Sequence, residues 1–219
     1  MLNHFSFVSP TKMEFGLGAV SKLPEMISKL GAKKVLLVTD PGVAQAGVLK
    51  KVTDQIENKV EYAVFDRVAS DPSTDNIQEI YEMAKAQGTE CFVAIGGGSA
   101  IDASKGASCL MTNEGPLRAY GGVNKVPHKG MPLIAIPTTA GTGSEFTLFA
   151  VLSDLKENIK FTISSANIAP DVALCDPELT LTLPPKMTAA TGFDALTHAV
   201  ESYTSRIATP VTDILCLET

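Results

Sequence analysis

An aspartate and a histidine lie four residues apart in the segment TGFDALTHAVESY, residues 191–203. On a helix this spacing points the carboxylate of Asp194 and the imidazole of His198 from one face, where both could bind the same metal ion. A surface pair that only hydrogen bonds is the commoner outcome, although the apolar residues beside the pair favour a face that looks into a cleft. The other histidines, His4 and His128, have no partner ligand near them in the sequence. The pair is therefore either no metal site at all or half of one whose other ligands lie elsewhere.

A run of three glycines stands between a predicted strand and a predicted helix in AIGGGSAID, residues 94–102. Gly97 and Gly98 let a ligand approach the backbone, Ser99 can cap the helix, and the amides of the first turn favour a phosphate. A tight strand-to-helix turn is the alternative, but three glycines lose more backbone entropy than such a turn requires. Ile101 occupies the place of the last glycine in the G-x-G-x-x-G fingerprint, so this run is not that Rossmann motif.

Two further polar loops follow predicted strands. Asp40 ends the strand KVLLVTD, where a carboxylate could accept ribose hydroxyls and would repel a 2′-phosphate, although an aspartate before Pro-Gly is also a common turn former. Thr138, Thr139 and Thr142 stand in IPTTAGTGSE, and their hydroxyls suit phosphate or ribose oxygens unless the loop merely caps its own helix. Any one of these loops could be an ordinary turn, but three polar loops that all follow strands are harder to explain in that way.

These loops are positioned by an alternation of strand and helix patterns that begins at Lys33. Short apolar runs predict strands at 34–40, 61–68, 91–97 and 132–139, and helical spacing predicts helices at 43–58, 73–88 and 100–112. Strands that alternate with helices form a parallel sheet covered on both faces, and ligands bind at the carboxyl ends of its strands. Two strand-like runs around DLKEN predict a hairpin within 146–164, and 171–176 could add one more strand.

The strand patterns stop near Pro185, and the residues after it have helical spacing. We therefore expect an α/β domain with a parallel sheet at residues 1–184, followed by the beginning of an all-helical domain at 185–219. The last residues, DILCLET, lack a helix C-cap, which predicts that the helical domain is truncated at Thr219.

Composition and charge exclude several classes of function. The net charge is -6 and the isoelectric point is near 5.1, which argues against a nucleic-acid or anionic-membrane partner. No apolar run reaches the roughly 18 residues of a membrane-spanning helix, and the first residues lack a signal-peptide pattern, so the expected location is the cytoplasm. The four cysteines are scattered without a C-x-x-C motif, which predicts buried free thiols rather than disulfides.

Four motifs in this order, AIGGGSAIDASK, PLIAIPTTAGTGSE, DPELTLTLPP and ATGFDALTHAVESY, resemble the iron-containing (group III) alcohol dehydrogenases. The resemblance covers almost the whole chain, from FGLGAVSKLPE onward. It implies an α/β nucleotide-binding domain that takes NAD, or less readily NADP, followed by a helical metal-binding domain that takes Fe²⁺ or Zn²⁺. It further implies an enzyme that transfers a hydride between the nicotinamide and a small or primary alcohol or aldehyde substrate.

The resemblance assigns roles at matching positions only. The cofactor contacts that it implies are Asp40, Gly97, Gly98, Ser99, Asp102, Thr138, Thr139, Thr142 and, less strongly, Lys160. Among these, Asp40 would meet the adenosine ribose, the glycine turn would hold the pyrophosphate, and the threonines would line the rest of the groove. Asp194 and His198 would be two metal ligands, and the family's remaining histidine ligands would lie beyond Thr219. No catalytic residue other than the metal ligands is identified.

Two other interpretations stay open. A metal-free relative of the same fold, such as a maleylacetate reductase, resembles the nucleotide domain, but the presence of both Asp194 and His198 argues against it. The second alternative is a nucleotide-binding fragment without catalysis, because half a metal shell holds metal poorly and half a cleft cannot exclude water. We expect the 219-residue chain alone to be inactive, and the apolar helix face to favour aggregation or a homo-oligomer.

Overall fold

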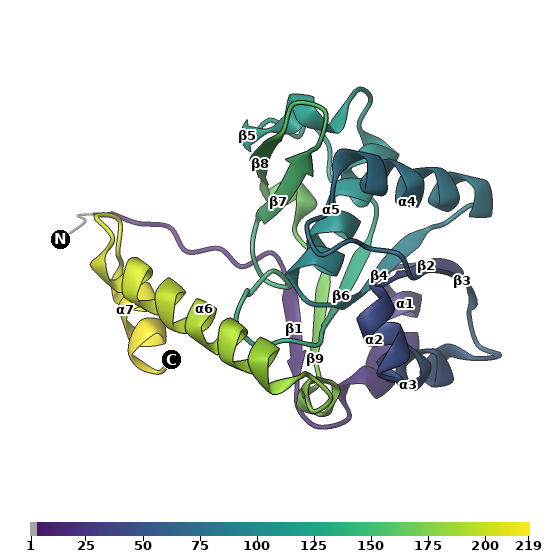
Figure 1. Ribbon diagram of the computed structural model, residues 1–219, viewed down its shortest axis with the longest axis horizontal. Helices are drawn as coiled ribbons and strands as arrows, with labels where there is room; N and C mark the ends of the chain where they lie inside the picture. The colour runs from purple at the N-terminus through teal and green to yellow at the C-terminus, as the bar shows by residue number, and fades with distance from the viewer. Residues whose placement is uncertain (1–3) are drawn as a thin grey trace.

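The computed structural model describes residues 4–219, which form a six-stranded sheet, a smaller three-stranded sheet and a projecting pair of helices (Figure 1). The large sheet has the strand order β1-β9-β6-β4-β2-β3, and all of its neighbouring strands run parallel. The strands are β1 (Lys12–Phe15), β2 (Lys34–Val38), β3 (Glu61–Phe65), β4 (Cys91–Gly96), β6 (Leu133–Pro137) and β9 (Val172–Cys175). The predicted α/β fold with a parallel sheet is confirmed.

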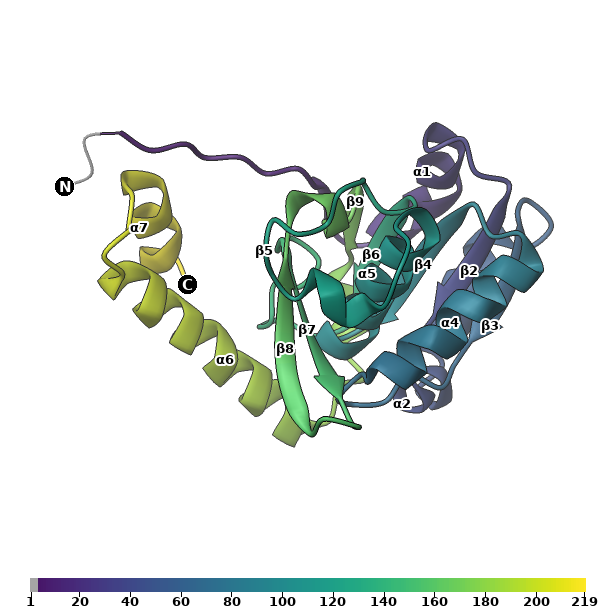
Figure 2. The ribbon, with the colours of Figure 1, turned by 90° about the horizontal axis from the view of Figure 1, so that it is seen from above.

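Helices cover both faces of this sheet, as Figure 2 shows. They are α1 (Leu23–Lys29), α2 (Pro41–Gln45), α3 (Val48–Ile56), α4 (Thr74–Gln87) and α5 (Gly98–Thr112). Successive residues of a strand point to opposite faces, so Leu36 and Val38 of β2 join a core with α4 and α5, whereas Val35 and Leu37 join a core with α1 and α3. Because both faces of the central strands are buried, these strands are continuous apolar runs in the sequence.

Several element boundaries differ from the prediction. The single helix expected at 43–58 is wrong: Gly47 has a φ of 77°, which ends α2 and starts α3 in a new direction. The strand expected at 61–68 ends at Phe65, and β1 and α1 were not predicted. The helix expected at 73–88 is confirmed as α4, which is capped at both ends: the Ser73 hydroxyl accepts from the Asn76 amide, and Gly88 is left-handed with a φ of 63°.

The small sheet consists of β5 (Gly122–Val123), β8 (Ile159–Ser164) and β7 (Phe149–Asp154), in that order. The predicted hairpin is confirmed, since β7 and β8 pair antiparallel from Phe149 opposite Ser164 to Asp154 opposite Ile159. Because β7 is an edge of this sheet, one side of its backbone has no strand to pair with.

The chain then leaves the α/β body through α6 (Pro185–Thr204), and α7 (Pro210–Leu217) folds back against α6, as both ribbon views show (Figures 1 and 2). Neither helix has a buried residue, and Phe193 of α6 is 72% exposed, so the expected exposure of this apolar face is confirmed. No helix within residues 4–219 is long and apolar enough to cross a membrane. All four cysteines are free, but only Cys91 and Cys109 are fully buried; Cys175 and Cys216 are half-buried, which corrects the expectation for those two.

Candidate functional site

The polar loops follow three adjacent strands that end at the same level. Val38 of β2 pairs with Ala94 of β4, and Gly96 of β4 pairs with Pro137 of β6, so the next residues of each strand meet at one edge of the sheet. The chain runs outward from β2 to β3 and then returns to place β4 on the other side of β2. Ligands of open α/β sheets bind at such a reversal, beyond the carboxyl ends of the strands.

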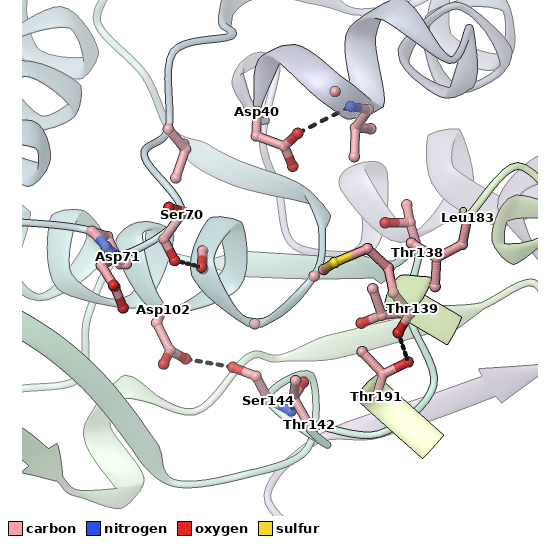
Figure 3. Close-up of a pocket in the computed structure, with 18 of the residues that line it drawn as sticks. Asp40, Ser70, Asp71, Asp102, Thr138, Thr139, Thr142, Ser144, Leu183 and Thr191 are labelled. Carbon is pink, nitrogen blue, oxygen red and sulfur yellow. Dashed lines mark hydrogen bonds between the residues drawn. The ribbon is translucent and has the colours of Figure 1, made fainter. Parts of the chain in front are cut away.

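A cleft of about 1050 Å³ lies at this edge. It is lined by all of the predicted site residues except Lys160, and Figure 3 shows the labelled side chains arranged around a common space. The loop before β7, β7 itself, and residues before and within the first turns of α6 complete the lining, which includes Ser144, Thr147, Phe149, Val151, Leu183 and Thr191. The cleft therefore lies between the α/β body and the projecting helix.

Asp40 performs the local role of a turn former and still faces the cleft. Its Oδ1 accepts a hydrogen bond from the Val43 amide at 3.0 Å, which caps α2 (Figure 3). Its Oδ2 makes no hydrogen bond within residues 4–219, and a Cβ added at Gly96 would lie 3.3 Å from it. One carboxylate oxygen is thus available to a ligand beside the glycine turn.

The glycines of this turn let two loops pack against each other. Gly96 has a φ of 150°, and a Cβ there would lie only 2.8 Å from the Ala100 Cβ. A Cβ at Gly97 or Gly98 would come within 3.2 Å of the methyl group of Thr139 or Thr142 respectively. Because Gly97 and Gly98 have no side chains, the loop of residues 138–144, called the threonine loop below, can pack over the start of α5.

Ser99 does not cap α5, which corrects the prediction. The helix begins at Gly98 after Gly97, and no side chain caps it. The Ser99 hydroxyl instead donates to the carbonyl of Ser70, in the loop that follows β3. The amides at the start of α5 therefore have no side-chain acceptor, which leaves them for an anionic ligand.

The hydroxyl groups of the threonine loop differ in whether they have a hydrogen-bond partner. The Thr139 Oγ1 is buried and has no hydrogen-bond partner within residues 4–219, whereas the Thr142 Oγ1 accepts from the Ser144 amide at 3.2 Å. The Thr138 amide donates to the Gly96 carbonyl at 3.1 Å and ties the loop to β4. A buried hydroxyl without a partner in a cleft wall fits a polar ligand that supplies one.

Both carboxylate oxygens of Asp102 are engaged by the protein. Its Oδ1 accepts from the Ser144 hydroxyl and its Oδ2 from the Val151 amide at 2.9 Å. Burial raises the pKa of Asp102, opposed by the charge of Lys105 at 3.7 Å. Lys105 itself is fully buried, and sequence reasoning missed it; the only signal was a lysine three residues after an aspartate, a spacing that is usual on exposed helices.

Lys160 lies outside the cleft lining. Its ammonium group forms an ion pair with Asp71 at 2.8 Å, and both side chains are largely exposed. Asp71 does line the cleft, so the structure places Lys160 at the mouth rather than inside.

Asp194 and His198 come together as the spacing predicts. The Asp194 Oδ1 and the His198 Nε2 are 3.7 Å apart, and both residues line the cleft. Gly141 of the threonine loop touches α6 beside them, because a Cβ at that glycine would lie 2.1 Å from the Thr191 carbonyl oxygen. Within residues 4–219 no group of three His, Cys, Asp or Glu side chains could hold a metal ion. Within this part of the chain, the two side chains alone could offer ligands to one ion at this place.

Known proteins match this chain along most of its length. The family model for iron-containing alcohol dehydrogenases matches residues 10–177, and the model for the C-terminal part of the Fe-containing alcohol dehydrogenase family matches residues 188–219. A sulfoacetaldehyde reductase of Bilophila wadsworthia is 42% identical over 208 residues, which are 94% of this chain and 54% of that protein. The chain thus spans about half the length of the relatives it matches.

Solved structures match equally well. A 1,3-propanediol oxidoreductase superposes with a TM-score of 0.95 at 38% identity, over 99% of this chain and 57% of that chain. A sulfoacetaldehyde reductase of Bifidobacterium kashiwanohense in complex with NAD⁺ has a TM-score of 0.91 at 33% identity, with the same coverage of 99% and 57%. With the cleft, the glycine turn and the aspartate–histidine pair in their expected places, the chain belongs to the iron-containing alcohol dehydrogenase family.

Proposed function

We propose that this chain binds NAD in the cleft and forms part of a metal-dependent dehydrogenase acting on a small or primary alcohol or its aldehyde. The observation that carries the proposal is the convergence of three strand-end loops and the Asp194–His198 pair on one cavity. A nucleotide site and a metal pair in one cavity bring a hydride acceptor beside an activated alcohol. The names of relatives, which include a sulfoacetaldehyde reductase and a 1,3-propanediol oxidoreductase, support the reaction class.

In this proposal the adenosine ribose lies against Asp40. The Oδ2 of its carboxylate can accept ribose hydroxyls, while Oδ1 stays on the Val43 amide. The same charge would repel a 2′-phosphate, which favours NAD over NADP. The NAD⁺ complex of the Bifidobacterium relative supports this choice of cofactor.

The pyrophosphate would lie at the start of α5, against the backbone amides of Gly97, Gly98 and Ser99. The dipole of this 15-residue helix and its uncapped amides favour negative charge there. The threonine loop would complete the groove, with the unpartnered Thr139 hydroxyl donating to the cofactor. Lys160, at the mouth of the cleft, would contact the cofactor only after breaking its ion pair with Asp71.

Asp194 and His198 would hold the metal ion, Fe²⁺ or Zn²⁺, since one carboxylate and an imidazole suit either ion. When bound, such an ion would supply Lewis-acid activation of an alcohol oxygen, and the nicotinamide would supply a hydride acceptor. The chain's own contribution is to orient the two reactants: α6 brings its ligand pair to the cleft, and the apolar Leu183 and Phe149 exclude water from part of the wall.

The first test is calorimetric titration of the chain with NAD⁺ and with NADP⁺. We expect NADP⁺ to bind at least about tenfold more weakly, because its extra phosphate lies against the Asp40 carboxylate. Asp40→Asn should narrow this difference while it keeps the helix cap, since asparagine caps as well as aspartate. Asp54→Asn, at an exposed position on α3, is the matched control and should change neither affinity. Absence of NAD⁺ binding to the folded chain would refute the proposal.

A nucleotide-binding module without catalysis is the second candidate, because residues 4–219 contain no group of three side chains that could hold a metal ion. We expect the chain to bind NAD⁺ weakly and to produce no NADH from ethanol or butanol, with or without added Fe²⁺ or Zn²⁺. Metal-dependent NADH production by the purified chain would contradict this expectation and favour the complete dehydrogenase.

A further inference from the structure

Lys105 is a fully buried lysine in the third turn of α5. Its ammonium lies 2.6 Å from the carbonyl oxygen of Phe149 and 3.0 Å from that of Thr147. It also lies 3.2 Å from the hydroxyl groups of Ser144 and Thr147. A buried charge requires such partners, and all of these acceptors belong to residues 144–149.

The contacts satisfy the free edge of β7. Phe149 and Val151 are two residues apart on this strand, so their backbone groups face the same side. The Phe149 carbonyl accepts from Lys105, and the Val151 amide donates to the Asp102 carboxylate. The Ser153 amide continues the series by donating to the Pro72 carbonyl at 3.0 Å. Two side chains of α5 thus take the place of a neighbouring strand.

The segment held in this way is a wall of the cleft. Ser144, Thr147, Phe149 and Val151 all line it, and α5 also carries the glycine turn at its start. Figure 3 shows the hydrogen bond between Asp102 and Ser144 that belongs to this attachment. The width of the cleft between the glycine turn and the small sheet therefore depends on the Asp102–Lys105 pair.

We propose that Lys105 is a positioning residue for the nucleotide site: with Asp102, it holds residues 144–151 at a fixed distance from the glycine turn. The inference rests on the proposed NAD site. Lys105 is fully buried and its ammonium is bonded to residues 144–149, so it acts through the wall and not by touching the cofactor. An ammonium is suited to this task because it donates three hydrogen bonds from one atom.

The attachment depends on the charge of Lys105, because a neutral amine donates only two hydrogen bonds. The charged groups that face Lys105 are Asp102 on α5 and Glu145 in the loop, and both favour the protonated form. Burial outweighs them and lowers the pKa of Lys105 to about 8. The wall should therefore loosen as the pH rises past this value.

The experiment measures NADH affinity by fluorescence at pH values on both sides of 8, for the wild-type chain, Lys105→Met and Lys51→Met. Methionine keeps the length of the side chain and removes the charge, and Lys51 is exposed on α3. We expect Lys105→Met to weaken binding about tenfold at neutral pH, as loss of a charged hydrogen-bond donor does. Wild type and Lys51→Met should lose affinity above pH 8. Lys105→Met should not lose affinity above pH 8. Because Asp102 and Glu145 are still present in this variant, any pH dependence that they cause would remain in its profile.

A second measurement needs no nucleotide. The backbone amide NMR signals of residues 147–151 should shift with a midpoint near pH 8 in the wild-type chain and should not do so in Lys105→Met. This titration also decides the matter if Lys105→Met does not fold, because a wild type without such a midpoint overturns the inference.

The outcomes separate this inference from the proposed function. If the wild type does not bind NADH, the proposed function fails and the wall has no nucleotide to position. If it binds NADH but Lys105→Met binds equally well, or keeps the alkaline loss of affinity, Lys105 is not a positioning residue and the NAD site stands.

Discussion

Gly141→Ala gives the sharpest test of how α6 meets the α/β body. The added Cβ would lie 2.1 Å from the Thr191 carbonyl oxygen, 2.7 Å from the carbonyl carbon and 2.9 Å from the Thr191 Cβ. Ordinary contact begins at 3.4 Å, so the loop and the helix must separate by about 1.3 Å. Two of these three atoms are backbone, which means that no side-chain rotation relieves the clash.

The helix should move and the loop should stay. α6 has no buried residue, whereas the threonine loop follows β6, every residue of which is buried. A rigid helix would transmit the displacement to Asp194 and His198, and a misplacement of about 1 Å can cost a hundredfold in catalysis. Overpacking should also lower the free energy of unfolding by about 1–3 kcal/mol.

Gly192→Ala is the matched control, because it is the same substitution one residue after Thr191 and its Cβ would meet no atom within 4 Å. In the interior of a helix this change should raise the free energy of unfolding by about 1 kcal/mol. Urea denaturation measures both variants, and amide NMR should show shifts along α6 for Gly141→Ala and only local shifts for Gly192→Ala. Equal stability of Gly141→Ala and wild type, with unmoved α6 signals, would refute the reasoning.

Three further predictions concern the rest of the site. Gly96→Ala should lower the free energy of unfolding by more than about 2 kcal/mol, measured by urea denaturation, because Gly96 has a φ of 150° and the added Cβ would clash with Ala100. Gly115→Ala is the control: its φ of 105° is also strained, but the added Cβ meets no atom within 4 Å, so it should lower the free energy of unfolding less. Between pH 8 and 10.5 Lys105 is protonated in the unfolded chain and neutral in the folded chain, so the unfolding free energy of wild type should rise with pH relative to Lys105→Met, by roughly 3 kcal/mol in all. Comparing the two chains removes the opposite contribution of the buried cysteines, because burial raises the pKa of their thiols in both. Urea denaturation that gives the same pH dependence for both chains would contradict this prediction. His198→Ala should abolish the weak binding of Co²⁺ measured by NMR line broadening, while the control His128→Ala should retain it. Retention of Co²⁺ binding in both variants would place the metal elsewhere.

Local patterns were enough to predict the buried central strands and the loops that follow them. β2, β4 and β6 are buried on both faces, so the sequence carries them as unbroken apolar runs. Polar residues follow β2 and β6, and glycines follow β4. Parallel pairing then requires those loops to share one edge, which is why Asp40, Gly97 and Thr138 could be expected in one cleft. The Asp194–His198 distance needed only helix periodicity.

Contacts between residues distant in the sequence had no such signal. Lys105 resembles an exposed helix lysine in the sequence, and it is buried because β7, about forty residues later, presents an unpaired edge to α5. Ser99 stands at a plausible capping position, but the carbonyl of Ser70 is near enough to take its hydroxyl. Gly141 resembles any loop glycine until α6 crosses it. The sequence by itself determined which elements form and which chemistry they carry, because those depend on near neighbours; the tertiary structure decided which polar groups are left for a ligand and which are used to hold the cleft together.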